Sequence, residues 1–433
     1  FQAEDGIRDR SPSRGLGDVY KRQVKAYEAI FTCCSPGAHV VLIGNNAEPV
    51  PMNWAILFSK GLEFQTVHRY SHQYEPSIRL LERGKINVKP MITHTFKFEE
   101  SVEAFLRGDI SMPQFDDYFA NQAKDYQNKL TKPQGSLGRV EDFAIWMAGW
   151  QKKINPTIDN THCLIYAGNH GVATQGVSAY PSDVTAQMVE NFKRGGAAIN
   201  QICKLANIQL SVIPIDLEYP TRDFSKEAAM GLEETIAAMQ LGFDSVNQDC
   251  DLLLLGEMGI SNTTAATAIA CALFKKPVEA WTGIGTGLDE KRLANKISVI
   301  KSAIELHGQN FKSPESILAT LGGRELAAIV GSIIAARLLR IPVLLDGFIC
   351  TSAAATLTIF DNKILDHCLV SHLSTEPGHY GILSCLNKKP ILDLNLRLGE
   401  GSGAAIASLI IKSSIAIHNG MATFNEAGVS QKN

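Results

Sequence analysis

Two glutamates stand where apolar, strand-like runs give way to glycine-rich turns. Glu400 lies between Gly399 and Gly401, after an alternating apolar run at 391–398 and before an apolar, helix-like run at 404–417. Glu257 similarly follows the apolar run at 252–255. A carboxylate at such a turn can serve as a general base in a ligand pocket. It can equally stabilise the positive end of a helix, and position alone weights these two interpretations about evenly for Glu400.

Further polar or glycine-rich motifs follow other apolar runs. They are Gly-Asn-His-Gly (168–171), Gly-Glu-Met-Gly-Ile-Ser-Asn-Thr-Thr (256–264), Gly-Ile-Gly-Thr-Gly (283–287), Asp-Gly-Phe (346–348), Ser-Thr-Glu-Pro-Gly-His (374–379) and Gly-Glu-Gly-Ser-Gly (399–403). None is a Walker loop or a complete dinucleotide fingerprint. As a set they indicate a phosphate-bearing ligand held by backbone amides and hydroxyls. His170, His372 and His379 are zinc ligands by type, but structural roles are favoured because no metal-binding spacing accompanies them.

The elements that carry these motifs alternate between short apolar runs and helical patterns. Strands are expected at 162–167, 210–215, 252–255, 278–281, 343–345, 368–371 and 391–396. Helices are expected at 184–193, 264–273, 291–307, 325–339 and 403–417. This alternation predicts an α/β fold with a mainly parallel, Rossmann-like sheet flanked by helices. The motifs should then converge at the carboxyl ends of the strands, where such sheets bind ligands.

Composition narrows the class of protein. The chain has 433 residues, of which 45% are hydrophobic and 20% charged, enough for a sizeable core and more than one domain. A net charge of −3 gives no electrostatic case for binding nucleic acid or an anionic membrane, and no apolar run reaches membrane-spanning length. The nine cysteines include no CxxC pair, which predicts reduced thiols and a cytoplasmic protein.

The first part of the chain divides differently from the rest. Residues 1–23 are polar, are expected to be disordered, and resemble a translated sequencing adapter, so we interpret them as an artefact. Residues 24–111, including a predicted strand at 39–44, resemble the C-terminal tail of medium-chain, zinc-type alcohol or polyol dehydrogenases. The matching pieces lie at 36–44, 84–86 and 98–105, without the family's zinc ligands or its dinucleotide turn. We therefore expect no dehydrogenase activity from this segment.

Residues 112–433 form the third segment, whose motifs are much more specific. Leu-Thr-Lys-Pro-Gln-Gly-Ser-Leu-Gly (130–138), Ala-Gly-Asn-His-Gly-Val (167–172), Gly-Val-Ser-Ala-Tyr-Pro (176–181), Val-Thr-Ala-Gln-Met (184–188) and the motifs above resemble the nicotinate-nucleotide–dimethylbenzimidazole phosphoribosyltransferases in order along 112–430. Two departures are Asn169, where that family often has Asp, and Ser261, where it often has Gly. The resemblance implies a homodimer with a small helical subdomain built from the ends of this segment.

The resemblance also implies a reaction and its catalytic residues. Nicotinate would be displaced from nicotinate mononucleotide by a benzimidazole nitrogen, with inversion at C1′ and without a metal or cofactor. Glu400 matches the family's proton acceptor, and one base is sufficient because the pyridine leaves as a neutral ring. Glu257 matches a second acidic position and is expected to be an auxiliary carboxylate. The alternative for Glu257 is a helix cap.

The remaining candidates are substrate-binding residues, each with a simpler alternative. Gly285, Thr286, Gly287 and Lys296 are expected to bind the 5′-phosphate, unless Lys296 is an exposed helix lysine. The benzimidazole pocket is expected to include Ser178 and Gln187, with Met188 or Met258 against the flat ring. The alternatives are that Gln187 lies on the surface and that the methionines only fill core. Asp346 is expected at the ribose or nicotinate, or alternatively as a cap. The candidates from the turns themselves are Gly259, Gly399 and Gly401.

Two other functions compete with this hypothesis. A catalytically silent nucleotide-binding protein would share the glycine-rich turns but would not need Glu400 as a base. An NAD-linked dehydrogenase rests only on residues 24–108 and is disfavoured by the missing cofactor turn. Product formation from nicotinate mononucleotide would separate the first alternative from the transferase hypothesis.

Overall fold

The computed structural model describes residues 18–20, 35–43, 59–61, 63–67, 100–285, 287–309 and 311–430. The chain divides into two compact units, Phe1–Thr95 and Phe96–Asn433. In the first unit, β1 (Asp18–Tyr20), β2 (His39–Ile43) and β3 (Glu63–Val67) form a parallel sheet in the order β1-β2-β3. The predicted strand at 39–44 is β2. Asp18–Tyr20 pair with β2, and the other residues of 1–23 lie outside the described residues, so the expectation of disorder in this segment stays a prediction.

The second unit begins before the segment that resembles the transferases. Its first helix, α4 (Ser101–Leu106), buries Val102 and Phe105 in the core beside α9 (Leu232–Asp244). The Val102 N–H donates to Gln240 Oε1 at 3.3 Å, and the Phe105 ring meets Phe360 edge to face at 5.5 Å between centroids. The division at 111 and 112 rests on sequence resemblance and stays a prediction.

A five-stranded parallel sheet lies at the centre of the second unit. Its order is β5-β4-β6-β7-β8, formed by β5 (Gln209–Pro214), β4 (Thr161–Ala167), β6 (Leu252–Met258), β7 (Val343–Leu345) and β8 (Cys368–Val370). Leu164 on β4 pairs with Leu255 on β6, which pairs in turn with Leu345 on β7. The predicted α/β fold with a mainly parallel sheet is therefore confirmed.

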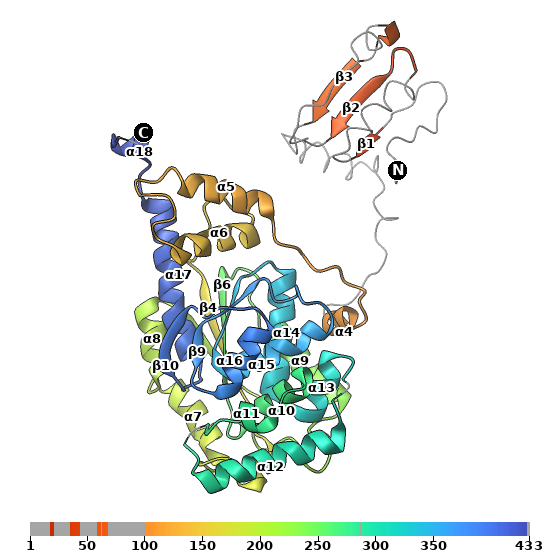
Figure 1. Cartoon of the computed structure of the whole chain (residues 1–433), viewed down its shortest axis with the longest axis vertical. Helices are drawn as coiled ribbons and strands as arrows, with labels where there is room; N and C mark the ends of the chain where they lie inside the picture. Colours follow the sequence, from red (N-terminus) through yellow and green to blue (C-terminus); the bar gives the residue numbers. More distant parts are fainter. Residues whose placement is uncertain are drawn as a thin grey trace. The chain divides into compact units, whose positions relative to one another are not determined.

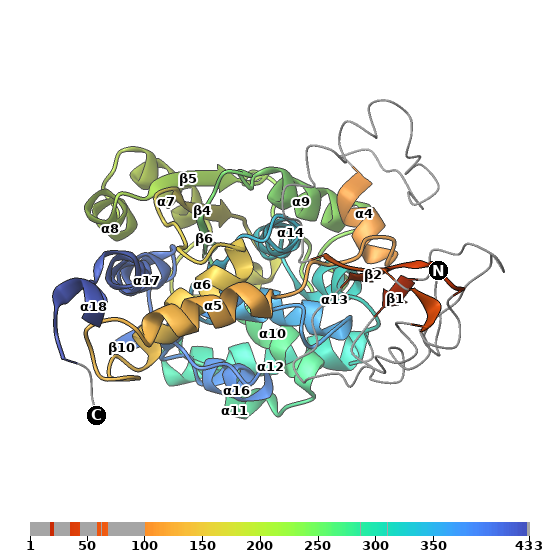
Figure 2. The same ribbon diagram turned by 90° about the horizontal axis from the view of Figure 1, so that it is seen from above.

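Alternate residues of the central strands feed two separate cores. Leu253 and Leu255 of β6 join the core formed with α9, α10 (Asn262–Phe274), α13 (Pro314–Leu321), α14 (Arg324–Leu338) and α15 (Gly347–Ala355). Leu252 and Leu254 join the opposite core with α6 (Arg139–Gln151), α7 (Asp183–Lys193), α8 (Ala198–Ala206) and α17 (Ser402–Gly420). The period of two along a strand requires this division. Figure 2 shows β4 and β6 between α17 and α14, and Figure 1 shows the same layers from the side.

A helical subdomain joins the two ends of the transferase-like segment, as expected. The helix α5 (Asp117–Gln127) packs on α6, and α6 packs on α17. Leu130 forms an antiparallel bridge with Thr423, just before α18 (Phe424–Ala427), and the Thr131 N–H donates to the Ala422 carbonyl at 3.0 Å. The beginning and end of this segment are thus tied together.

Two of the predicted strands differ from the structure. Residues 278–281 form a short helix, α11 (Val278–Trp281), beside α12 (Glu290–His307), and the Trp281 ring packs on Phe274 instead of joining a sheet. Residues 391–396 contain β10 (Leu392–Leu396), which pairs with β9 (His372–Ser374) in a separate two-stranded parallel sheet. Half-exposed side chains along β10 suit such an edge position better than the central sheet.

Within the described residues, the state of the cysteines and the apolar character of the helices can be stated directly. The described cysteines carry free thiols, and all but Cys385 are buried. None of the helices in the described ranges combines the length and apolar character that spanning a bilayer requires.

Glycines allow α9 and α14 to cross closely behind the sheet. A Cβ on Gly331 would overlap the Met239 carbonyl, and a Cβ on Gly242 would overlap the Ala328 carbonyl. We predict that Gly331→Ala lowers the free energy of unfolding by about 1–3 kcal/mol, because the helices must separate. Urea unfolding followed by circular dichroism measures the change.

Gly420→Ala is the matched control, since a Cβ at the end of α17 meets no atom within 4 Å. Alanine is intrinsically better than glycine in a helix by about 1 kcal/mol. A Gly331→Ala protein as stable as the Gly420→Ala protein would show that the crossing tolerates a methyl group.

Candidate active site

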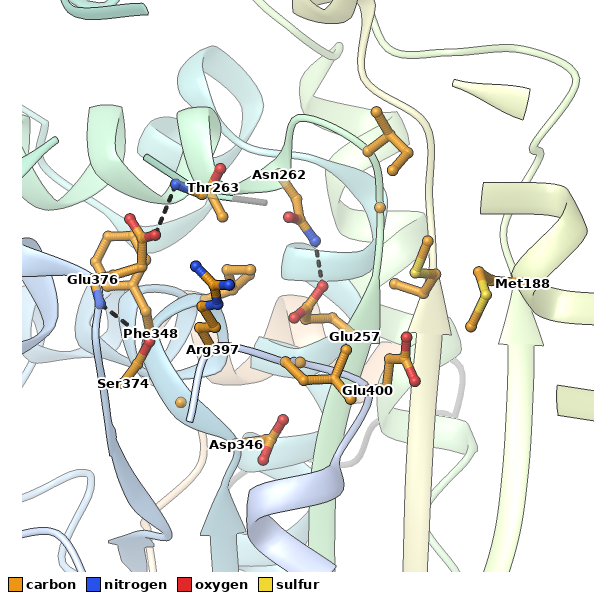
Figure 3. Close-up of a pocket in the computed structure, with 18 of the residues that line it drawn as sticks. Met188, Glu257, Asn262, Thr263, Asp346, Phe348, Ser374, Glu376, Arg397 and Glu400 are labelled. Carbon is orange, nitrogen blue, oxygen red and sulfur yellow. Dashed lines mark hydrogen bonds between the residues drawn. The ribbon is translucent and has the colours of Figure 1, made fainter. Parts of the chain in front are cut away.

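The turns at the carboxyl ends of the strands enclose a cavity of about 390 Å³ (Figure 3). The predicted site residues that line it are Glu257, Met258, Gly259, Gly285, Asp346, Gly399 and Glu400. The volume lies within the range of small-molecule sites. These residues come from the ends of β6, β7 and β10 and from the loop before α12, so the sheet edge brings distant motifs together as expected.

The other predicted residues lie around this cavity. Ser178 and Lys296 line a smaller adjoining cavity of about 30 Å³, which shares Gly259 and Gly285 with the first. Gln187 is exposed on α7 and lines neither cavity, which matches its alternative interpretation as surface. Gly287 and Gly401 lie in the turns beside the lining residues, and Thr286 lies outside the described residues.

Glu400 is held in a left-handed turn at the start of α17. Its φ is 69° and that of Gly401, the N-cap of the helix, is 75°. A side-chain-bearing residue in this conformation costs on the order of 1–2 kcal/mol. The Glu400 N–H donates to the Glu257 carbonyl at 3.1 Å, and a Cβ on Gly256 would overlap the Gly401 amide. Backbone contact between the two turns therefore sets the position of Glu400.

Asp346 holds the same turn from the neighbouring strand. Its Oδ2 accepts the Gly401 N–H at 2.9 Å and its Oδ1 accepts the Ala404 N–H at 2.8 Å. The carboxyl group thus caps α17 from the end of β7, as the alternative for this residue anticipated. Its contact with ribose or nicotinate stays a prediction.

The three neighbouring carboxyl groups have raised pKa values. Burial raises the pKa of Glu257 to about 8, with the charge of Asp346 adding to it. Burial raises the pKa of Asp346 to about 7 despite its helix-capping hydrogen bonds. Burial alone raises the pKa of Glu400 to about 7. A carboxyl group that titrates near neutrality in a cavity is suited to proton transfer.

Glu257 is fixed from two sides. Its Oε2 accepts a short hydrogen bond from the Asn262 side-chain amide at the start of α10. A Cβ on Gly399 would overlap Glu257 Oε1, so only glycine fits there without displacing the carboxyl group. The glycine before Glu400 is therefore explained by close approach to the second carboxyl group.

Lys296 is fully buried beside Gly285. Its Nζ donates to Thr263 Oγ1 at 3.0 Å and to the Gly283 carbonyl at 3.3 Å, and burial lowers its pKa to about 8. The alternative of an exposed helix lysine is therefore wrong. Beside it, the Gly285 N–H donates to Glu376 Oε1 at 2.9 Å. Ammonium, hydroxyl and backbone amide groups thus gather where the small adjoining cavity meets the main one, at Thr263 and Gly285.

The three histidines considered as zinc ligands have other partners. His170 Nε2 and Glu325 Oε1 are 2.5 Å apart and buried. His379 Nδ1 accepts the Ser374 N–H at 2.9 Å and so braces the loop that carries Glu376. His372 lines the cavity, with Nδ1 3.0 Å from Ser371 Oγ. Within the described ranges, no group of three or more His, Cys, Asp or Glu residues is placed to hold a metal ion.

The opposite end of the cavity is largely apolar. Tyr180 and Val184 from the α7 region line it with Met188, Met258 and Ile260. Figure 3 shows Met188 beyond Glu400 on the side away from Glu376. A flat apolar ring placed here would have the Glu400 carboxyl group at its edge.

Several lining residues were not singled out from the sequence. They are Tyr180, Val184, Ile260, Asn262, Thr263, Phe348, Ile349, Ser374, Glu376, Arg397 and Leu398. Many of these lie inside the motifs already noted. The signal that the sequence offered for them was that each motif follows a strand at the same edge of the sheet. The sequence did not indicate which side chain of each motif faces the cavity.

The raised pKa values predict how stability depends on pH. A carboxyl group whose pKa is higher in the fold than in the unfolded chain favours folding below its unfolded pKa, and that contribution is lost as pH rises through the folded value. Folding stability should therefore decline from about pH 4.5, the ordinary glutamate value, to about pH 8, the pKa of Glu257 in the fold, and then level off. We predict that Glu257→Gln makes this decline shallower by on the order of 1 kcal/mol or more.

Urea midpoints across this pH range measure the effect. Glu290→Gln, on the exposed face at the start of α12, is the control and should leave the slope unchanged. Parallel slopes for the Glu257→Gln and unsubstituted proteins would contradict a raised pKa at Glu257.

Comparison with known proteins is consistent with this geometry. A sequence profile of a phosphoribosyltransferase family matches residues 112–429. The chain is 49% identical over 333 residues to nicotinate-nucleotide–dimethylbenzimidazole phosphoribosyltransferase of Mesorhizobium japonicum, covering 77% of this chain and 99% of that protein. It is 53% identical over 304 residues to the enzyme of the same name from Methylorubrum extorquens, covering 70% and 89%.

Solved structures agree with the sequence relatives. A structure of nicotinate-nucleotide–dimethylbenzimidazole phosphoribosyltransferase from Thermus thermophilus aligns with a TM-score of 0.68 at 35% identity, covering 73% of this chain and all of that one. A structure of CobT from the same organism gives the same TM-score at 36% identity. From residue 112 onward, the chain therefore belongs to the nicotinate-nucleotide–dimethylbenzimidazole phosphoribosyltransferase family.

Proposed function

We propose that the chain transfers the phosphoribosyl group of nicotinate mononucleotide to a benzimidazole-type base, 5,6-dimethylbenzimidazole in the family's name. The products would be α-ribazole 5′-phosphate, a precursor of the cobalamin lower ligand, and nicotinate. The observation that carries the proposal is the buried Glu400 carboxyl group, with its pKa near 7, beside the apolar end of the cavity. Relatives about 50% identical that bear this enzyme's name support it.

Glu400 acts as the general base in this proposal. One benzimidazole nitrogen attacks C1′ and forms the new C–N bond, while the N–H on the other nitrogen gives its proton to the Glu400 carboxylate. A base whose pKa lies near the working pH balances the ionised fraction against basicity. The turn that carries this acceptor is held by the Glu400 N–H on the Glu257 carbonyl and the Gly401 N–H on the Asp346 carboxyl group, which favours a fixed orientation toward the bound ring.

The leaving group needs no acid. The C1′–N bond to the pyridinium ring breaks with its electron pair passing to the ring nitrogen, so the ring departs without a charge on nitrogen. Displacement on the side opposite the leaving group converts the β-nucleotide into the α-product in a single step. No covalent enzyme intermediate is required, in contrast to retaining glycosidases.

The phosphate of the nucleotide is assigned to the corner that contains Lys296. Lys296 Nζ, Thr263 Oγ1 and the Gly285 N–H are donors of the type that bind phosphate. The Gly285 N–H is donated to Glu376 in this structure, so phosphate binding there exchanges one acceptor for another. Gly287 lies in the same loop, and the expected role of Thr286, which lies outside the described residues, stays a prediction.

Glu257 is assigned an auxiliary role. With a pKa of about 8, it is largely protonated at neutral pH and adds little negative charge beside Glu400. This keeps the second carboxyl group from competing as a base. Cytoplasmic location and homodimer formation, both inferred from the sequence, belong to the same proposal.

Glu400→Gln tests the base directly. We expect the variant to lose at least ~10²-fold in kcat, the size typical of a missing general base. Formation of α-ribazole 5′-phosphate from nicotinate mononucleotide and dimethylbenzimidazole, followed by chromatography, measures it. Glu290→Gln on the exposed face of α12 is the control and should retain full activity.

Three outcomes separate the hypotheses. Equal activity of the Glu400→Gln and unsubstituted proteins would mean that the transfer occurs and Glu400 only stabilises the turn. A folded chain that binds the nucleotide but forms no product with any benzimidazole would favour the silent nucleotide-binding protein. Hydride transfer to NAD with polyols would instead favour the dehydrogenase-like segment.

The pH dependence of the same reaction follows from the pKa of Glu400. The base must be ionised, and burial raises its pKa to about 7, so kcat should rise as pH increases through about 7 and then level off. Initial rates between pH 5.5 and 9 at saturating substrates measure this limb. Glu400→Gln should lack the limb near pH 7, and a limb that persists in the variant would assign it to another group.

A further inference from the structure

Arg397 brings a positive charge into a cavity otherwise rich in carboxyl groups. It follows β10 and lies three residues before Glu400, with its side chain exposed. Of the described residues that line the cavity, it is the one lysine or arginine, whereas the carboxyl groups are those of Glu257, Asp346, Glu376 and Glu400. Burial lowers the pKa of the lining His372 to about 4, so that imidazole is neutral at physiological pH.

The guanidinium has no partner in the described part of the chain. No described side chain or carbonyl forms a hydrogen bond or ion pair with it. Figure 3 shows it pointing into the cavity rather than away from it. Five N–H donors in a fixed planar fork are suited to a planar carboxylate. A free guanidinium in this position indicates an anionic group of the ligand.

Stereochemistry indicates which anionic group that is. In an inverting displacement, the incoming base and the leaving ring lie on opposite sides of C1′. The incoming base is assigned to the end that contains Met188 and Glu400. Figure 3 places Arg397 and the Phe348 ring on the other side of Glu257 from Met188. The leaving pyridine ring and its carboxylate therefore belong at the end where Arg397 and Phe348 lie.

The phosphate already has other donors. Nicotinate mononucleotide carries two anionic groups, the 5′-phosphate and the ring carboxylate. Lys296 and Thr263 are hydrogen-bonded to one another in the corner assigned to the phosphate, where Lys296 is fully buried. Arg397 is therefore the cation available to the second anionic group, the ring carboxylate.

We infer that Arg397 binds the carboxylate of the nicotinate ring, with Phe348 against the ring face, and so selects the acid over the amide at the leaving-group position. This inference rests on the proposed function and specifies its donor substrate. The ring carboxylate keeps its charge when the C1′–N bond breaks, because the electron pair passes to the ring nitrogen. The ion pair is thus present in substrate, transition state and product alike. Its loss should raise KM and weaken product binding while leaving kcat nearly unchanged.

The test compares acid and amide ligands in Arg397→Gln and in the unsubstituted full-length chain. Donors are nicotinate mononucleotide and nicotinamide mononucleotide, and binding of free nicotinate and free nicotinamide is measured by calorimetry. We expect kcat/KM for the acid donor and affinity for nicotinate to fall about 10–100-fold in the variant. Values for the amide ligands should not change. Arg397→Lys should recover part of the loss, because it restores charge without the planar fork.

Arg194→Gln is the matched control, because Arg194 pairs with Glu190 on the exposed surface of α7. It should leave all four ligands unaffected. An equal loss for acid and amide donors in Arg397→Gln would overturn the inference. In that case nicotinate riboside, which lacks the phosphate, is tested as the donor. If Arg397 binds the phosphate, the unsubstituted chain prefers nicotinate mononucleotide to the riboside and Arg397→Gln loses that preference. Unchanged values for every ligand would overturn the inference as well.

Failure of the proposed function has a different signature. If the unsubstituted chain forms no product from nicotinate mononucleotide, the transferase proposal fails. Calorimetry with free nicotinate still decides the binding site in that case. Loss of nicotinate binding on Arg397→Gln, with nicotinamide unaffected, would support the subsite, whereas equal binding by both proteins would overturn it.

Discussion

One buried carboxyl group, that of Asp346, ties the turn that carries Glu400 to the central sheet. Its two oxygens accept the amides of Gly401 and Ala404, while the Glu400 N–H reaches the carbonyl of Glu257. The ends of β6 and β7 and the start of α17 are thus held as one unit. An otherwise unfavourable left-handed conformation at Glu400 is tolerated because these contacts determine it from both sides.

The same arrangement places three carboxyl groups in a poorly hydrated space, and this has opposing effects. Burial moves the pKa of Glu400 to about 7, where a carboxylate is most useful as a base. It also means that the folded chain holds protons that the unfolded chain would release at neutral pH. Stability from these groups is therefore lost as the base becomes ionised. Active sites commonly carry such a conflict, and here the capping of α17 offsets part of it.

The cavity is polarised along its length. Methionine, tyrosine and valine side chains from the α7 region form one end, and Phe348, Arg397 and the corner near Lys296 form the other. Glu257 and Glu400 lie between them (Figure 3). This order matches a displacement in which an apolar base enters from one side and an anionic ring leaves on the other. Orientation of two bound substrates by fixed walls can contribute as much as proton transfer itself.

Much of this could be predicted from the sequence, because strand and helix periods and glycine-rich turns are local properties. The α/β fold, the convergence of the turns at one sheet edge, and Glu400 between a strand and a helix all follow from them. The family resemblance added the reaction class. Local pattern failed at Val278–Trp281, which forms a short helix beside α12 with the Trp281 ring packed on Phe274. Only the tertiary structure decided that Lys296 is buried, that Gln187 faces solvent, that Asp346 caps α17 and that Arg397 enters the cavity. Burial, capping partners and pKa values depend on residues far apart in the chain, and only folding brings those residues into contact.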